Sequence, residues 1–181
     1  MARSPVVALV VAGLLAMPIA ARSARPAARA SALVNGIVTR VVDGDSLWFQ
    51  PAAGGAPIAV RLAGIDAPEI CQPGGPEARR FLADLVNGHP AQLRVAAGRA
   101  GRDDFGRTLA TLRRDGIDVN RHLVEQGHAW SHRYKWDRGP YVAEERMARA
   151  LRRGLHRGGA AALMPRDFRR LHGPCTAASG P

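Results

Sequence analysis

The segment LVNGIVTRVVDGDSLWFQ, residues 33–50, decides how the fold begins. Its two ends are rich in β-branched and aromatic residues, which favour strands. Between them stands Asp43-Gly44, a dipeptide typical of tight hairpin turns. The segment therefore predicts a β-hairpin with strands at 33–42 and 46–50.

The rest of the chain extends this hairpin into a barrel. Short alternating runs predict three more strands, and apolar residues at helical spacing predict three helices. The strands are expected at 58–63, 92–96 and 107–113, and the helices at 76–86, after Asp118 and from Pro140. This order predicts an α+β, mainly β fold, a five-stranded OB-fold barrel capped by three helices. Barrels of this kind commonly bind nucleic acids or oligosaccharides.

The composition points to a polyanionic partner. The chain has 181 residues and a net charge of +11. Residues 1–30 hold four arginines and no acid, which leaves +7 on residues 31–181. A basic surface attracts nucleic acids or anionic membranes. Because Lys135 is the one lysine among 26 basic residues, GC-rich coding is an alternative source of the charge.

The N-terminus has the pattern of a secretory signal peptide. Residues 6–21 are uncharged and mostly apolar, and they are shorter than the ~20 residues that span a bilayer as a helix. Ala-x-Ala-like sites follow, so we expect a signal peptide at 1–24 with cleavage between 20 and 30. The mature protein is then secreted or periplasmic, without stable membrane insertion. The alternative is an uncleaved anchor that holds an envelope-associated interaction domain.

Cys71 and Cys175 are the two cysteines of the chain. In an exported protein an even number of cysteines favours a disulfide; two unpaired thiols are the alternative. The bridge would place the C-terminal tail, residues 158–181, near the loop that follows Glu69. This tail is rich in Gly, Ala and Pro, and we expect it to be flexible and weakly structured. There is no CxxC or HExxH motif, which argues against a zinc site.

Charged residues gather in four short stretches that can meet on one face of the barrel: Asp43 with Asp45, Arg61, residues 66–69, and the RDDFGR loop that ends at Arg107. Each stretch also has a structural interpretation. Asp43-Gly44 can shape a turn, and residues 66–69 can form a helix capping box. Arg61 can pair with one of the acids, and the two aspartates of RDDFGR can be a solvated loop.

Taken together, the stretches fit the hydrolysis of a phosphodiester. Asp45 and Asp66 supply the oxygen ligands that Ca²⁺ prefers. The planar forks of Arg61 and Arg107 match a phosphate. Glu69 is then placed to orient or deprotonate the attacking water.

Four ordered motifs carry a family resemblance. VVDGDS, RLAGIDAPE, FGRTLA and VNRHLVEQGHAW resemble the staphylococcal-nuclease-like family over residues 34–156. The resemblance implies a nuclease domain at 31–157 that binds Ca²⁺ and cuts DNA and RNA, leaving a 3′-phosphate. It also implies a monomer that favours single strands.

By motif match, Asp45, Asp66 and the backbone carbonyl of Ala67 are similar to the calcium ligands of the family. Asp43 resembles a nearby aspartate of the family that supports these ligands without binding the metal itself.

The same match assigns the reacting groups. Arg61 and Arg107 resemble the phosphate-binding arginines of the family, and Glu69 resembles its catalytic glutamate.

Departures from the family pattern concern the nucleotide contacts. Asp104 stands where a phosphate-contacting lysine can occur, and Phe105 replaces a tyrosine. The two tyrosines that frame the nucleotide have no clear match, because Tyr134 and Trp136 lie in a shifted register. The main hypothesis is therefore an exported Ca²⁺-dependent nuclease. The alternative is an OB-fold module that binds nucleic acid or another polyanion without cutting it.

Overall fold

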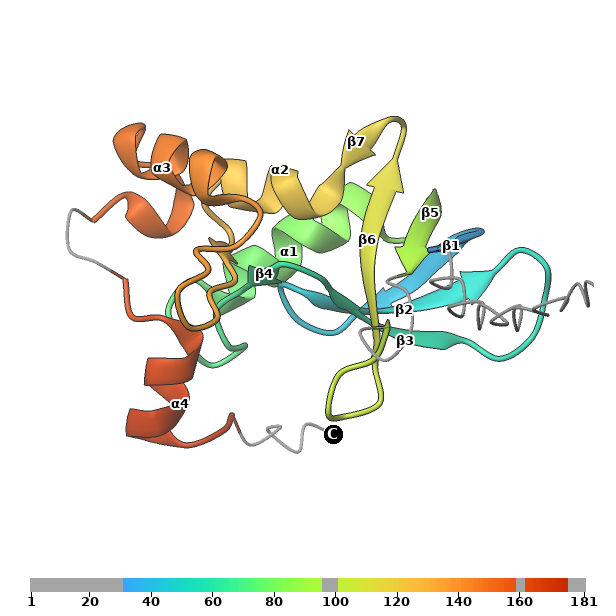
Figure 1. Ribbon diagram of the computed structural model, residues 1–181, viewed down its shortest axis with the longest axis horizontal. Coiled ribbons are helices and arrows are strands. Elements are labelled where there is room, and N and C mark those ends of the chain that lie inside the picture. The colour runs from blue at the N-terminus through green and yellow to red at the C-terminus, as the bar shows by residue number, and fades with distance from the viewer. Residues whose placement is uncertain (1–30, 96–100, 159–161, 176–181) are drawn as a thin grey trace, which may run out of the picture.

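The protein forms a small closed β-barrel with helices at one end (Figure 1). The computed structural model describes residues 31–95, 101–158 and 162–175. The sheet order is β3-β2-β1-β5-β6, all antiparallel, and a parallel pairing of β3 with β6 closes the barrel. The predicted five-stranded OB barrel is confirmed. Its strands are β1 (Ala32–Val41), β2 (Ser46–Pro51), β3 (Ile58–Leu62), β5 (Pro90–Val95) and β6 (Thr108–Arg114).

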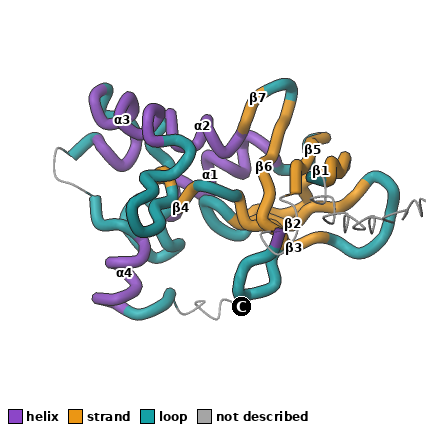
Figure 2. Tube along the Cα trace, viewed as in Figure 1, coloured by secondary structure: helices purple, strands orange, loops and turns teal. Residues whose placement is uncertain are grey.

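Three helices are those that the sequence predicts, α1 (Gly75–Val86), α2 (Val119–Glu125) and α3 (Val142–Ala150). The Asp118 side chain caps α2 by accepting a hydrogen bond from the Arg121 amide at 3.0 Å. The structure also contains short elements that the sequence did not predict, of which β4 and β7 are labelled in Figure 2. They are β4 (Ile65–Asp66), which pairs with β8 (Trp130–Ser131), β7 (Ile117–Asp118) beside β6, and the single turn η2 (Gly154–His156).

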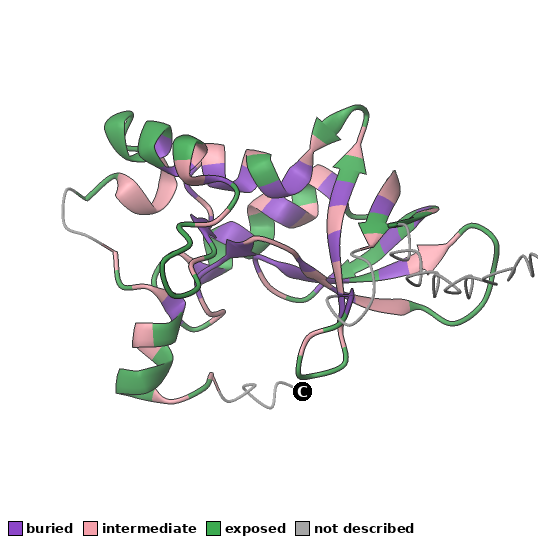
Figure 3. Cartoon of the chain, viewed as in Figure 1, coloured by how far each residue is buried: buried purple, intermediate pink, exposed green. Residues whose placement is uncertain are grey.

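A fourth helix, α4 (Pro165–His172), lies in the predicted tail. The prediction that residues after 158 are weakly structured is wrong for this segment. Figure 1 shows α4 below the other helices, well away from the barrel strands. It is exposed or half-buried along most of its length (Figure 3), so it contributes little to the core.

The first hairpin depends on one close contact and one bulge. A Cβ at Gly36 would lie 2.1 Å from the Gln50 carbonyl oxygen and 2.5 Å from the Phe49 ring, so only glycine fits there. Val38 pairs with Phe49, but Arg40 pairs with Trp48, which makes Thr39 an extra residue. Such a bulge bends the strand. The bulge also explains why the next inward-facing residue after Val38 is Val41, three positions later instead of two.

The core fills the barrel and continues under α1 and α2. Each large apolar side chain buried there contributes roughly 1.5–3 kcal/mol relative to exposure. This packing fixes the β1–β2 turn and the end of β3, the two places from which the predicted site residues project. The fully buried members include Val38, Leu47, Phe49, Val60, Leu62, Leu82, Leu93, Leu112 and Leu123.

Cys71 and Cys175 form a disulfide, with an S–S distance of 2.00 Å and a Cα–Cα distance of 5.8 Å. The predicted bridge is thus present, and the alternative of free thiols is wrong. Among the described residues, no helix is long and apolar enough to cross a membrane. The predicted signal peptide lies in residues 1–30, outside the described residues.

Candidate functional site

The predicted site residues converge on one cleft of about 680 Å³. The cleft lies where the β1–β2 turn, the end of β3, β4 and the loop before β6 come together, and α4 forms a further wall. Every reacting residue that the sequence predicts lines it. These residues are Asp43, Asp45, Arg61, Asp66, Ala67, Glu69 and Arg107.

Arg61 bridges the two carboxylates predicted to bind the metal. Its Nη1 pairs with Asp45, and its Nη2 lies 3.0 Å from Oδ1 of Asp66. The structural interpretation of Arg61 as a partner of these acids is therefore correct for the free protein. One guanidinium contacts both side chains, so Asp45 and Asp66 are close enough to share a single cation.

Asp45 is held from several sides, and only 6% of its surface is exposed. Its Oδ2 accepts a hydrogen bond from the Ala67 amide at 2.8 Å, and its Oδ1 accepts one from the Ser46 hydroxyl at 3.1 Å. Asp43 accepts a bond from the Asp45 amide at 2.9 Å, so it shapes the turn. Asp43 thereby aims Asp45 toward the cleft.

Burial and the oppositely charged neighbours act in opposite directions on the pKa of Asp45 and on that of Arg61. Burial raises the pKa of Asp45 from 3.8 to about 7, although the charge of Arg61 lowers that pKa. For Arg61, burial lowers the pKa, but Asp45 and Asp66 raise it by more, so the guanidinium stays charged. The raised pKa of Asp45 means that Arg61 compensates its buried negative charge only in part.

A hard divalent cation fits this donor set. Asp45 and Asp66 offer carboxylate oxygens, and Ca²⁺ prefers oxygen ligands. A divalent ion would also supply the positive charge that buried Asp45 lacks. Within the described residues no three His, Cys, Asp or Glu side chains are grouped as a metal site. A cation bound here would therefore take its ligands from the two aspartates together with backbone and water oxygens.

Arg107 is aligned by its own loop. Its amide and Nε donate to the Asp103 carboxylate at 2.8 and 2.7 Å, and its Nη1 donates to the Ser46 hydroxyl at 2.9 Å. Burial raises the pKa of Asp103, but the bonds from Arg107 lower it by more, and the net shift is downward. The interpretation of Asp103 as a merely solvated acid is therefore wrong.

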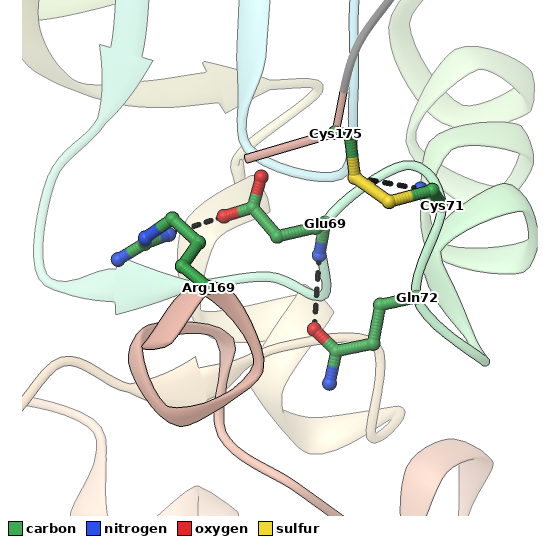
Figure 4. The surroundings of a disulfide bond; sticks show 5 residues. All are labelled: Glu69, Cys71, Gln72, Arg169 and Cys175. Carbon is green, nitrogen blue, oxygen red and sulfur yellow. Dashed lines mark hydrogen bonds and ion pairs between the residues drawn. A yellow bond between two sulfur atoms is a disulfide. The ribbon is translucent and has the colours of Figure 1, made fainter. Parts of the chain in front are cut away.

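Glu69 follows the short strand β4 and lines the cleft. Its carboxylate points toward Arg169 (Figure 4). The Glu69 amide donates to Oε1 of Gln72 at 3.2 Å, and the Glu69 carboxylate pairs with Arg169 of α4. The capping-box interpretation of residues 66–69 is wrong, because α1 begins only at Gly75 with Gly74 as its N-cap.

Arg169 is a cleft residue that the sequence analysis missed. Its helix is only 8 residues long and carries two large apolar side chains, Phe168 and Leu171, so it was not recognised within a tail rich in Gly, Ala and Pro. The one available signal was the predicted disulfide, which placed the tail near the loop after Glu69.

Of the three exposed aromatic residues considered for nucleotide contacts, one lines the cleft and two do not. Phe105 lines the cleft and is 85% exposed, and its ring centroid lies 5.5 Å from the Arg107 guanidinium carbon. Tyr134 and Trp136 are also exposed, but they are not among the residues that line the cleft. Phe105 is therefore the aromatic side chain that the structure brings to the predicted site.

Comparison with known proteins gives the family. The family model of the staphylococcal nuclease homologue matches residues 59–157. An uncharacterized endonuclease of Haemophilus influenzae is 36% identical over 118 residues, which cover 65% of this chain and 64% of that protein. A micrococcal nuclease of Shigella flexneri is 36% identical over 132 residues, covering 67% of this chain and 72% of the relative.

A probable staphylococcal-like nuclease of Oryza sativa subsp. japonica is 36% identical over 101 residues, which are 55% of this chain but 26% of the plant protein. The chain thus spans about a quarter of the plant relative and nearly two thirds of the Haemophilus one. The matched region contains Arg61 of β3, Asp66 of β4, Glu69 of the loop after β4 and Arg107 of the loop before β6. The chain therefore belongs to the staphylococcal nuclease homologue family.

Proposed function

We propose that the protein is an exported, monomeric, Ca²⁺-dependent nuclease that hydrolyses phosphodiester bonds of DNA and RNA and leaves 3′-phosphate products. One observation carries the proposal. In a chain of this family, two aspartates, two arginines and a glutamate of the required types line a single cleft. The basic charge of residues 31–181 supports a polyanionic substrate.

The metal is assigned to Asp45, Asp66 and the carbonyl of Ala67. When bound, Ca²⁺ would supply positive charge to a phosphate oxygen and hold a water beside it. The chain's part is to present the two carboxylates on rigid elements. Asp45 is fixed by the Ala67 amide and the Ser46 hydroxyl, and Asp66 lies in β4.

The two arginines are assigned to the scissile phosphate. Arg61 and Arg107 enter the cleft from different elements, β3 and the loop before β6. In the free protein each pairs with aspartates, so their positive charges are partly compensated. A phosphate likewise offers two acceptor oxygens to the planar fork of an arginine, and it can replace the carboxylate partners.

Glu69 is assigned as the group that accepts a proton from the attacking water. The water oxygen bonds to phosphorus while the bond from phosphorus to the 5′ oxygen breaks, and that oxygen takes up a proton from solvent. A positioned general base contributes typically about 10²–10⁴-fold to such a rate. In the free protein Arg169 pairs with Glu69, so this contact must open before Glu69 can act.

The proposal of export rests on the predicted signal peptide and the disulfide. Disulfides persist in oxidising compartments and are rare in the cytosol. A bridge whose cysteines are separated by 104 residues, one of them beside the proposed catalytic loop, suits a protein that works outside the cytosol.

A non-catalytic binding module is the second candidate, and one observation favours it. Arg61 pairs with both Asp45 and Asp66, and Arg169 pairs with Glu69. A cleft that kept these pairs would present basic side chains to a polyanion without a free base.

The test is cleavage of single-stranded DNA and RNA by the protein purified under oxidising conditions, with Ca²⁺ or with EGTA. Cleavage that requires both Ca²⁺ and Asp45, and that Glu69→Gln and Arg107→Ala each reduce at least 10²-fold, is the expected result. The products should accept 3′ extension only after phosphatase treatment. Asp115→Asn, an exposed acid outside this cleft, is the matched control.

Binding of DNA without cleavage in either condition would reject the nuclease and favour the binding module. Cleavage by folded Glu69→Gln at the wild-type rate would show that the assigned base is wrong. Products that can be extended without phosphatase would contradict the assigned bond.

A further inference from the structure

The helix α4 is a wall of the cleft that the family match does not include. The match ends at residue 157, and α4 begins at Pro165. Nevertheless Met164, Arg166 and Arg169 line the same cleft as the proposed catalytic residues. This chain therefore adds a basic element to the site from outside the matched region.

Two links fix α4 beside Glu69 (Figure 4). The Cys71–Cys175 bridge ties the end of the helical segment to the loop after Glu69. The second link is the side chain of Gln72, a residue that is only 4% exposed. Its Oε1 accepts a bond from the Glu69 amide at 3.2 Å, and its Nε2 donates to the Leu163 carbonyl at 2.5 Å. The segment that leads into α4 and the backbone of Glu69 thus share one buried side chain.

Arg169 repeats the pattern of the two proposed phosphate-binding arginines. Like Arg61 and Arg107, it projects into the cleft and pairs with a carboxylate in the free protein. Its side chain is 45% exposed, so a ligand in the cleft can reach it. Arg170, the next residue, is 75% exposed and pairs with Asp167 of its own helix instead.

We propose that Arg169 is a third phosphate-binding residue, which takes a phosphate that flanks the scissile one in a single-stranded nucleic acid. The proposal rests on the nuclease function above, because it deepens the substrate binding of that site. Arg61 and Arg107 take the scissile phosphate, and Arg169 stands on a separate wall. A flanking phosphate exchanges with Glu69 as the partner of Arg169, and this exchange frees the carboxylate for the attacking water.

The test compares two substrates that differ only in flanking charge. One is a pentathymidylate, and the other is the same pentamer with neutral methylphosphonates at every linkage except the central one. The wild type should have a lower KM for the fully charged pentamer. Arg169→Ala should lose that preference and raise the KM for the charged pentamer roughly five- to tenfold, because a half-exposed charged contact is lost. Arg169→Lys should restore part of the preference, and Arg170→Ala should behave as the wild type.

A second arm measures binding without cleavage. Affinity for the charged pentamer is determined in EGTA over a range of salt concentrations. One phosphate contact fewer reduces the slope of log K against log salt by about 0.7 for single strands. Arg169→Ala should show this reduction, and Arg170→Ala should keep the wild-type slope.

Two outcomes would overturn the proposal. Equal losses on both pentamers would show that Arg169 only positions Glu69, and an unchanged preference with an unchanged slope would show that Arg169 binds no phosphate. If the wild type itself cuts nothing, the nuclease function fails, and the salt slope alone then decides whether Arg169 contacts a phosphate.

Discussion

Nη1 of Arg107 lies 2.9 Å from the hydroxyl of Ser46. The same hydroxyl donates to Oδ1 of Asp45 at 3.1 Å. A single side chain therefore connects a proposed phosphate-binding arginine to a proposed metal ligand, across the start of β2.

Ser46→Ala should reduce kcat/KM for single-stranded DNA about tenfold or more. The variant leaves a buried carboxylate oxygen and the guanidinium without a shared partner, and hydrogen bonds to charged groups contribute roughly 1.5–3 kcal/mol. About 1.4 kcal/mol corresponds to a tenfold change in rate. Ser46→Thr keeps the hydroxyl and should stay near the wild type. Equal kinetics for the alanine and threonine variants would show that the connection has no role.

Gly75→Ala should displace Glu69. A Cβ at Gly75 would lie 2.0 Å from the Glu69 carbonyl oxygen, so the backbone of one of them must move. We expect a lower kcat and a lower free energy of unfolding, measured by steady-state cleavage and urea unfolding. Gly158→Ala is the matched control, because a Cβ there meets no atom within 4 Å. Wild-type kinetics in Gly75→Ala would mean that the loop adapts without cost to Glu69.

The stability of the cation-free protein should fall as the pH rises from about 4 to about 7. Burial raises the pKa of Asp45 from 3.8 to about 7, so in this range the folded chain holds a proton that the unfolded chain has released. Stability decreases with pH wherever the folded state binds more protons. Urea unfolding in EGTA across this range measures the slope. Asp45→Asn should flatten it; a slope equal to that of the wild type would assign the effect to other groups.

Removing the disulfide should lower the free energy of unfolding by about 2–4 kcal/mol, because the bridge closes a long loop in the unfolded chain. The double variant Cys71→Ser/Cys175→Ser tests this by urea unfolding, and reduced wild type should give the same midpoint. Both proteins should also have a higher KM for the charged pentamer than the oxidised wild type, because α4 loses its covalent link to the loop after Glu69. An unchanged unfolding midpoint would refute the stabilising role.

Most of the barrel was predictable because its signals are local. The Asp43-Gly44 turn and the β-branched runs around it define a hairpin without reference to the rest of the chain. The two-residue strands β4 and β8 were missed, since two residues are too few to show an alternation. The bulge at Thr39 was also missed, because it is set by pairing with β2.

The sequence could predict that the site residues lie together, but it could not predict their contacts. The motifs identified Arg61, Asp45 and Asp66, yet only the fold shows one guanidinium between two carboxylates. The helix α4 was missed because it is only 8 residues long and lies in a tail rich in Gly, Ala and Pro, with Phe168 and Leu171 as its large apolar residues. Its attachment depends on the disulfide and on Gln72, two long-range contacts that no local sequence pattern reveals.

The bridge between Cys71 and Cys175 also makes a covalent ring of most of the chain. The α-helices of the described residues, α1 to α4, and the strands β5 and β6 lie between the two cysteines. If a protease cuts one peptide bond inside this ring, both pieces remain parts of the same molecule. Losing a fragment then requires a second event, either reduction of the bridge or another cut. Where reductants are scarce, a protein that has been cut once inside this ring therefore stays covalently whole.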